Sequence, residues 1–309
     1  DTRGVVTNST ITPTVYAPDP PSADPETTSG KKGAAQTTDL LVGDATSDPD
    51  ITLVASSVKL CNPASNPVEV SPNCTLTTLV VPNVGTYTVV NGVMTFTPLS
   101  NYFGTPTPVA YQVTDSMGGT ATSTYTPTVI SAPTANDDVS SAGYDVTQTI
   151  TPLSNDTAGG SPLVASSVKL CGIDDPATTG VNETETPNNC TKTSLTIPGV
   201  GTYTVNTSTG VVTFDPLPTF YGTASPITYQ VADALGQYAN ATITPTVAAP
   251  PVPTASPNPS SDAWDTNQTI NPLTNDAAGA ADFPLVATTV KLCGISPVET
   301  PNNCTQTTL

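Results

Sequence analysis

Six cysteines are the residues whose type and spacing point most directly to chemistry in this chain of 309 residues. They form three pairs, in which the first cysteine ends the sequence V-K-L-C and the second lies in N-C-T. The pairs are Cys61 with Cys74, Cys171 with Cys190, and Cys293 with Cys304. The distance between partners differs from pair to pair, whereas a zinc site or a redox C-x-x-C motif fixes its spacing. The sequence therefore predicts three local disulfides and an oxidising compartment, with free buried thiols as the alternative.

A second set of candidate residues is acidic. Asp115 and Asp233 each begin a D-x-x-G tetrapeptide, which is typical of a turn closed by the aspartate side chain. The alternative is calcium, which takes about six to eight oxygen ligands and would need several acidic side chains to converge. The further residues that such a site would use are Asp137, Asp138, Asn155 and Asp156. The turn is the favoured interpretation, and calcium is the one cofactor that the sequence leaves open.

Composition excludes several function classes. The chain has no histidine, so histidine-based triads, general bases and metal ligands are ruled out. Its formal net charge of −18 disfavours nucleic acids and anionic membranes as partners. No apolar run reaches the roughly 20 residues of a membrane helix, so we expect no membrane insertion. No nucleophile lies in a recognisable arrangement with a base, and we expect no enzymatic activity.

The elements that position these residues repeat along the chain. Residues 201–236 read GTYTVNTSTGVVTFDPLPTFYGTASPITYQVADALG, and residues 85–118 are a close copy. A period of about 115 residues indicates tandem whole domains. Apolar residues alternate with polar ones, as in Tyr203 with Val205 and in Val212 with Phe214, and this pattern predicts half-buried strands. With seven or so strands per copy and no helical period, the sequence predicts an all-β fold of tandem immunoglobulin-like β-sandwiches.

The copies define the expected domain boundaries. Residues 1–16 match the last strand of a repeat, residues 17–131 and 132–249 form two full repeats, and residues 250–309 match the first half of another. Proline-rich joints separate the copies and, as stiff spacers, predict an extended array. We expect the chain to be a section of a longer array.

The order of the motifs resembles that of a known family. Each full copy contains Y-Q-V-x-D-x-x-G, from Tyr111 and from Tyr229, followed by a strand that ends in T-P-T-V. Together with the L-x-N-D sequence at 153–156, this pattern resembles the CshA-type fibril repeat of long bacterial surface adhesins. The resemblance implies a stalk or fibril that projects an adhesive domain from the cell wall.

These observations lead to a structural hypothesis and two alternatives. The chain is expected to form stalk or filament repeats of an extracellular bacterial surface adhesin, at the cell surface or cell wall, without catalysis. Its partners would be the adjacent repeats and, in a filament, identical chains. The alternatives are an adhesive module that recognises a glycan or a host protein, and a subunit of a self-assembling extracellular filament.

Overall fold

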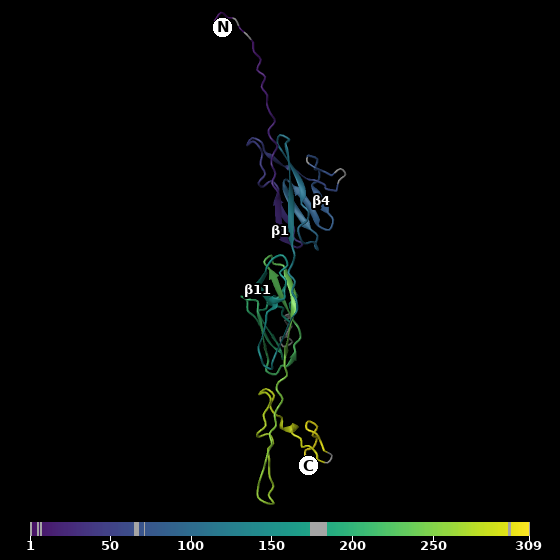
Figure 1. Cartoon of the computed structure of the whole chain (residues 1–309), viewed down its shortest axis with the longest axis vertical. Coiled ribbons are helices and arrows are strands. Elements are labelled where there is room, and N and C mark those ends of the chain that lie inside the picture. Colours follow the sequence, from purple (N-terminus) through teal and green to yellow (C-terminus); the bar gives the residue numbers. More distant parts are fainter. Residues whose placement is uncertain are drawn as a thin grey trace. The chain divides into compact units, whose positions relative to one another are not determined.

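The computed structural model describes residues 2–4, 6, 8–64, 68–70, 72–173, 184–295 and 298–308. It divides the chain into two compact units, each of which contains one β-sandwich (Figure 1). The first unit comprises Asp1–Ala132 with Gly159–Ser161, and the second comprises Pro133–Ala158 with Pro162–Leu309. Within the described residues, helical structure is limited to the short 3-10 turns η1 (Pro152–Ser154) and η2 (Ala287–Thr289), and no helix there could cross a membrane. The prediction of an all-β fold with tandem sandwiches is confirmed.

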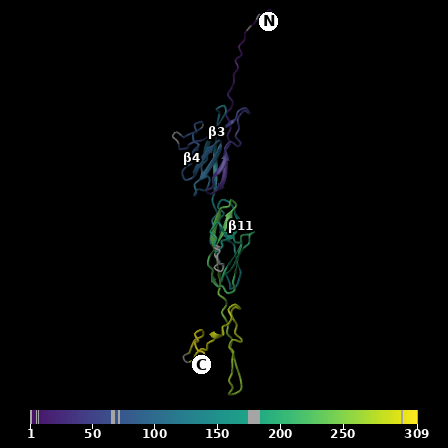
Figure 2. The same ribbon diagram turned by 180° about the vertical axis from the view of Figure 1, so that it is seen from behind.

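The first unit folds into two facing sheets. In spatial order, one sheet consists of β1 (Glu26–Lys31), β8 (Thr120–Ile130), β7 (Val109–Asp115) and β3 (Leu53–Leu60). The other consists of β2 (Gln36–Asp39), β6 (Val93–Pro98), β5 (Gly85–Val90) and β4 (Thr78–Val81). Figure 2 shows β3 and β4, which belong to opposite sheets.

The second unit repeats this order strand for strand. Its first sheet consists of β9 (Asp138–Ala142), β17 (Tyr238–Val247), β16 (Ile227–Asp233) and β11 (Leu163–Leu170), and the short β15 (Gly222–Thr223) also pairs with β17. Its second sheet consists of β10 (Gln148–Ile150), β14 (Val212–Pro216), β13 (Gly201–Val205) and β12 (Ser194–Ile197). The two sandwiches therefore share one topology.

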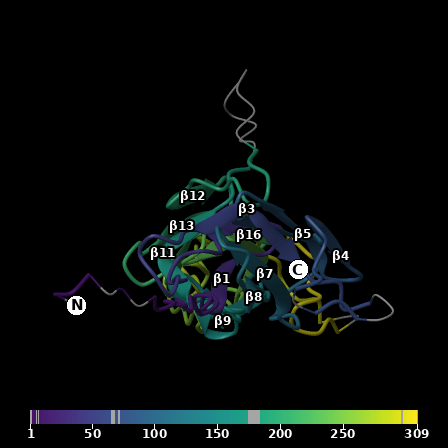
Figure 3. The ribbon, with the colours of Figure 1, turned by 90° about the horizontal axis from the view of Figure 1, so that it is seen from above.

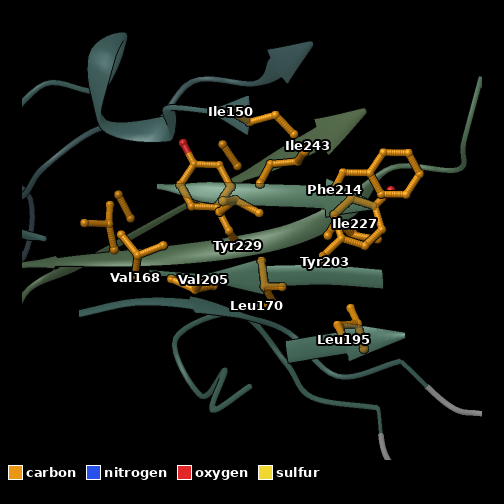
Figure 4. Packing of buried hydrophobic residues seen from close by; sticks show 14 of the residues in the cluster. Ile150, Val168, Leu170, Leu195, Tyr203, Val205, Phe214, Ile227, Tyr229 and Ile243 are labelled. Atoms are coloured by element: carbon orange, nitrogen blue, oxygen red, sulfur yellow. The ribbon is translucent and has the colours of Figure 1, made fainter. Parts of the chain in front are cut away.

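Alternation of side chains explains why these segments become strands that face a core. In β13 and β14, Tyr203, Val205, Val212 and Phe214 are buried while their neighbours face outward. The rings of Tyr203 and Phe214 lie 4.6 Å apart, and Tyr229 packs in the same core from the opposite sheet (Figure 4). Burial of these rings supplies much of the apolar contact of a domain that has few aromatic residues.

The first and last strands of each sandwich pair in parallel. β1 runs beside β8, with Glu26 opposite Tyr125 and Lys31 opposite Ile130. β9 runs beside β17 in the same way, with Asp138 opposite Ile243. Viewed along the long axis, β1, β8 and β7 lie next to one another in the first unit (Figure 3). The sequence predicts the last strand, which ends in T-P-T-V, but neither the first strand nor the direction of their pairing.

The two partial copies form less regular structure than their sequences predict. The described residues among 2–16 form no strand and are exposed. The described residues of 250–308 form isolated bridges, such as Thr254 with Ala277, and no extended ladder. In the full copies, the corresponding strands depend on partners from elsewhere in the same repeat, and neither partial copy contains a full set. A strand-like pattern therefore does not produce a strand by itself.

Candidate functional site

Each cysteine pair is brought together in the structure. A disulfide joins Cys61 to Cys74, Cys171 to Cys190, and Cys293 to Cys304, with Cα–Cα separations of 4.3, 4.2 and 4.3 Å. The first two disulfides are buried at the end of β3 and of β11. In each sandwich the disulfide closes a loop that leads from one sheet toward the other.

A buried glutamine holds the second cysteine of each closed loop. Gln112 Oε1 accepts a hydrogen bond from the backbone N–H of Cys74 at 3.1 Å, and Gln230 accepts one from Cys190 at 2.9 Å. Both glutamines belong to Y-Q-V-x-D, where strict alternation would turn them toward solvent. Both are buried and bind the backbone of the second cysteine, which lies against this face of β7 or β16. In the sequence these glutamines are recognisable only as part of the Y-Q-V-x-D motif, which does not predict this contact.

A glutamate within the same loop accepts hydrogen bonds from the residues that follow its two cysteines. Glu69 lies five residues before Cys74, and it accepts hydrogen bonds from the backbone N–H of Asn62 at 2.9 Å and from the hydroxyl of Thr75 at 2.8 Å. These bonds lower the pKa of Glu69. Glu185 and Glu299 make the equivalent bonds in the other two loops. The spacing E-x4-C-T recurs in all three copies, and it is the signal by which these residues could have been found.

Asp115 and Asp233 close turns. Asp115 Oδ1 accepts backbone N–H groups of Met117 and Gly119 at 2.9 and 2.8 Å. Asp233 Oδ1 does the same with Leu235 and Gln237, both at 2.9 Å. Its Oδ2 accepts the side-chain amide of Gln237 at 2.9 Å. Both carboxylates are buried, and each holds its own turn through these bonds.

The other acidic candidates lie in the second sandwich. Asp137 Oδ1 accepts the N–H and the hydroxyl of Thr242, each at 2.8 Å. Asn155 donates from Nδ2 to the carbonyl of Asp137 at 3.1 Å. Asp156 Oδ1 accepts the N–H of Asn136 and the hydroxyl of Tyr229, both at 2.9 Å. The side chains thus connect β9, the loop after β10, β16 and β17 through direct bonds.

The role of Asp156 recurs in every copy. Asp44 Oδ1 accepts the N–H of Asp24 at 2.7 Å, and Asp276 Oδ1 accepts that of Ser256 at 2.8 Å. The last residue of Q-x4-L-x2-D therefore fastens the segment that enters each repeat. This explains why the aspartate persists while its acidic neighbours change.

Asp138 differs from its neighbours because its Oδ2 is buried without a hydrogen-bond partner among the described residues. Burial raises the pKa of Asp138 to about 6, and the negative charge of Asp156 adds to the shift. The ionised form is therefore less favourable in the folded state than in the unfolded chain. Stability from this group is present below its unfolded pKa of 3.8 and is lost as the pH rises through about 6.

We expect Asp138→Asn to raise the free energy of unfolding of the second sandwich by about 1–2 kcal/mol at pH 7.5. At pH 4 the same substitution should change this free energy little. The adjacent exposed Asp137 is a control of opposite sign, because its bonds to Thr242 lower its pKa. Asp137→Asn should lower the stability of the second sandwich at pH 7.5. Thermal unfolding of the full chain as a function of pH, followed by hydrogen exchange in β16 and β17, measures both. An equal effect of Asp138→Asn at the two pH values would contradict the prediction.

Among the described residues, no group of three or more histidine, cysteine, aspartate or glutamate side chains is arranged to hold a metal ion. Calcium stays a prediction for Asp115, Asp137, Asp138, Asn155, Asp156 and Asp233, of which Asp115 and Asp233 each accept the bonds of their own turn. We expect EDTA to leave the melting temperature of the chain nearly unchanged. Differential scanning calorimetry with EDTA and with added calcium tests this, and a loss of many degrees in EDTA would establish a structural calcium site.

The fold and these contacts define a class of protein. Two sandwiches of the immunoglobulin-like type follow one another, each with a disulfide-closed loop and a set of recurring polar residues bonded within its own repeat. The family model for the surface adhesin CshA repetitive domain matches residues 18–129 and 131–247. The chain belongs to this family, and the resemblance seen in the sequence is confirmed.

Comparison with solved structures finds multidomain immunoglobulin-like and cadherin chains. Titin domains I67–I69 match at 14% identity with a TM-score of 0.30, over 79% of this chain and 70% of that one. The protocadherin GammaB4 extracellular domain matches at 11% identity with a TM-score of 0.34, over 78% of this chain and 35% of that one. These scores describe a similarity of fold class alone. A comparison with curated protein sequences found no match.

Proposed function

We propose that the chain forms spacer repeats of a bacterial surface adhesin, in an extracellular stalk or filament without catalytic activity. Membership of the family of the surface adhesin CshA repetitive domain supports a place at the cell surface. The disulfides support an oxidising, extracytoplasmic environment.

One observation carries the proposal: the glutamines, glutamates and aspartates of the recurring motifs are bonded within their own repeat. The glutamines of Y-Q-V bind the cystine loops, as with Gln230 and Cys190. The aspartates of D-x-x-G close turns, and those of Q-x4-L-x2-D fasten the entering segment. A substrate or ligand site needs polar groups directed at the ligand, and the recurring groups are already used for stability.

The shape of the full chain in solution tests the proposal. A compact globule of this length would have a radius of gyration of about 19 Å. We expect small-angle X-ray scattering on the full chain to give a clearly larger value and a cross-section set by one sandwich. A radius near that of the globule would contradict the spacer role.

The second candidate is an adhesive module, and the cystine loop is the observation in its favour. This loop differs most in length between copies, and a groove of about 330 Å³ lies beside it in the first repeat. The groove is lined by residues that include the exposed Val68 and Val70. Saturable binding of a glycan or host protein to this chain, lost in Val70→Asp, would favour this function. Concentration-dependent assembly in sedimentation velocity would favour a filament subunit.

A further inference from the structure

The covalent path of the chain determines where tension enters each sandwich. The first unit begins its sandwich with β1 and ends it with β8, and the chain then continues directly to β9 of the next sandwich. Any pulling force transmitted along a stalk must therefore enter a repeat through its first strand and leave through its last. In both sandwiches these two strands are hydrogen-bonded neighbours.

Parallel pairing sets the direction in which these strands are loaded. In a parallel pair, the N-terminal end of one strand and the C-terminal end of the other lie at opposite ends of the ladder. Pulling them apart slides β1 along β8, so the inter-strand bonds are loaded together. An antiparallel pair pulled from adjacent ends would open one bond at a time. The register from Glu26 with Tyr125 to Lys31 with Ile130 therefore resists tension as a unit.

A side chain from the other sheet bridges the two strands. Pro127 in β8 lies opposite Thr28 in β1. The proline removes no donor from this ladder, because alternate residues of β8, such as Val129, exchange their backbone bonds with Gly104 on the side away from β1. At this level Gln36 reaches in from β2 of the other sheet. Its Nε2 donates to the carbonyl of Thr128 at 3.0 Å, and its Oε1 accepts the hydroxyl of Thr28 at 2.5 Å. One buried carboxamide thus binds both strands of the pair.

The second sandwich repeats one of these two contacts. Gln148 Nε2 donates to the carbonyl of Thr246 in β17 at 3.0 Å. In β9, Ser140 stands where Thr28 stands in β1. The Oγ of Ser140 and the Oε1 of Gln148 are both buried without a partner among the described residues. In the third copy the hydroxyl of Ser260 donates to Oε1 of Gln268. A hydroxyl residue eight positions before the glutamine is thus common to all three copies.

We infer that the parallel pair of first and last strands is the mechanical clamp of each repeat. Its latch residues are Gln36, which binds both strands, and Gln148, which binds the last strand. This inference rests on the proposed spacer function, because only a stalk under tension uses such a clamp. The latch couples the pair to the second sheet, so sliding of the strands also breaks contacts of β2 or β10.

Force spectroscopy on the full chain, tethered at its two ends, tests the inference. Gln36→Met keeps the length of the side chain and removes both hydrogen bonds. Its matched control is Gln112→Met, because Gln36 and Gln112 are each 6% exposed and each makes two polar contacts in the same sandwich. We expect Gln36→Met to raise the unfolding rate of one repeat at constant force by about ten-fold, with little change for Gln112→Met. Gln148→Met removes only the bond to Thr246, so it should raise the unfolding rate of the other repeat in the same direction but by less than ten-fold.

Thermal unfolding of the same variants separates mechanical from general effects, since both glutamine changes should lower the melting temperature. Equal acceleration under force by Gln36→Met and Gln112→Met, or none by Gln36→Met, would overturn the assignment of the latch. Unfolding of the unchanged repeats at negligible force would instead contradict the load-bearing spacer function itself.

Discussion

Replacing Cys171 and Cys190 together by serine should lower the free energy of unfolding of the second sandwich by about 3 kcal/mol. The disulfide closes a segment with a sequence separation of 19, and its loss returns that conformational freedom to the unfolded chain. In the folded loop Glu185 still accepts hydrogen bonds from the N–H groups of Gly172 and Thr191, so the native structure should survive the change. Denaturant unfolding, followed by hydrogen exchange in β11 and β16, measures the loss.

The third disulfide supplies the matched control. Cys293 and Cys304 lie where the described residues form isolated bridges, so replacing them by serine should leave both sandwiches unchanged. Mass mapping without reduction should link peptides that contain Cys171 and Cys190. Peptides linked between repeats, or a double variant as stable as the unchanged chain, would contradict the local disulfide model.

The sandwich was predictable because its signal is local. Alternation in the segments around Tyr203 and Phe214 reports which side chains face the core, and the repeated text aligns the copies. The parallel pairing of β1 with β8 was not predictable in this way, because its partners lie about a hundred residues apart in sequence. No alternation pattern states which distant strand lies beside another.

The roles of polar residues were likewise predictable only where their partners are close in sequence. The turn at Asp115 is readable because donor and acceptor lie within four residues. Gln112 and Gln36 act on segments far away in sequence, at Cys74 and Thr128, so their motif position gave no indication of their contacts. Glu69 was within reach of sequence reasoning, since its spacing to Cys74 is constant, but attention to the cysteines alone passes over it.

Truncating Asp233 should be among the most damaging single changes in the second sandwich. The side chain is 2% exposed and accepts three hydrogen bonds, from two backbone N–H groups and the amide of Gln237. Asp233→Ala leaves these donors without their acceptor in a buried turn, and we expect a loss of about 3 kcal/mol. Urea unfolding of the full chain measures it, with Asp215→Ala as the control because Asp215 is exposed and accepts one bond from Thr147.

Asp233→Asn separates the turn from a metal site. An asparagine Oδ1 still accepts the N–H groups of Leu235 and Gln237, whereas the charge and the second carboxylate oxygen are gone. A turn therefore predicts that Asp233→Asn costs much less than Asp233→Ala, with or without EDTA. A calcium ligand predicts that both variants are equally damaging and that the unchanged chain loses the same stability in EDTA. Because the two interpretations predict a small and a large loss of stability for Asp233→Asn, one unfolding series decides between them.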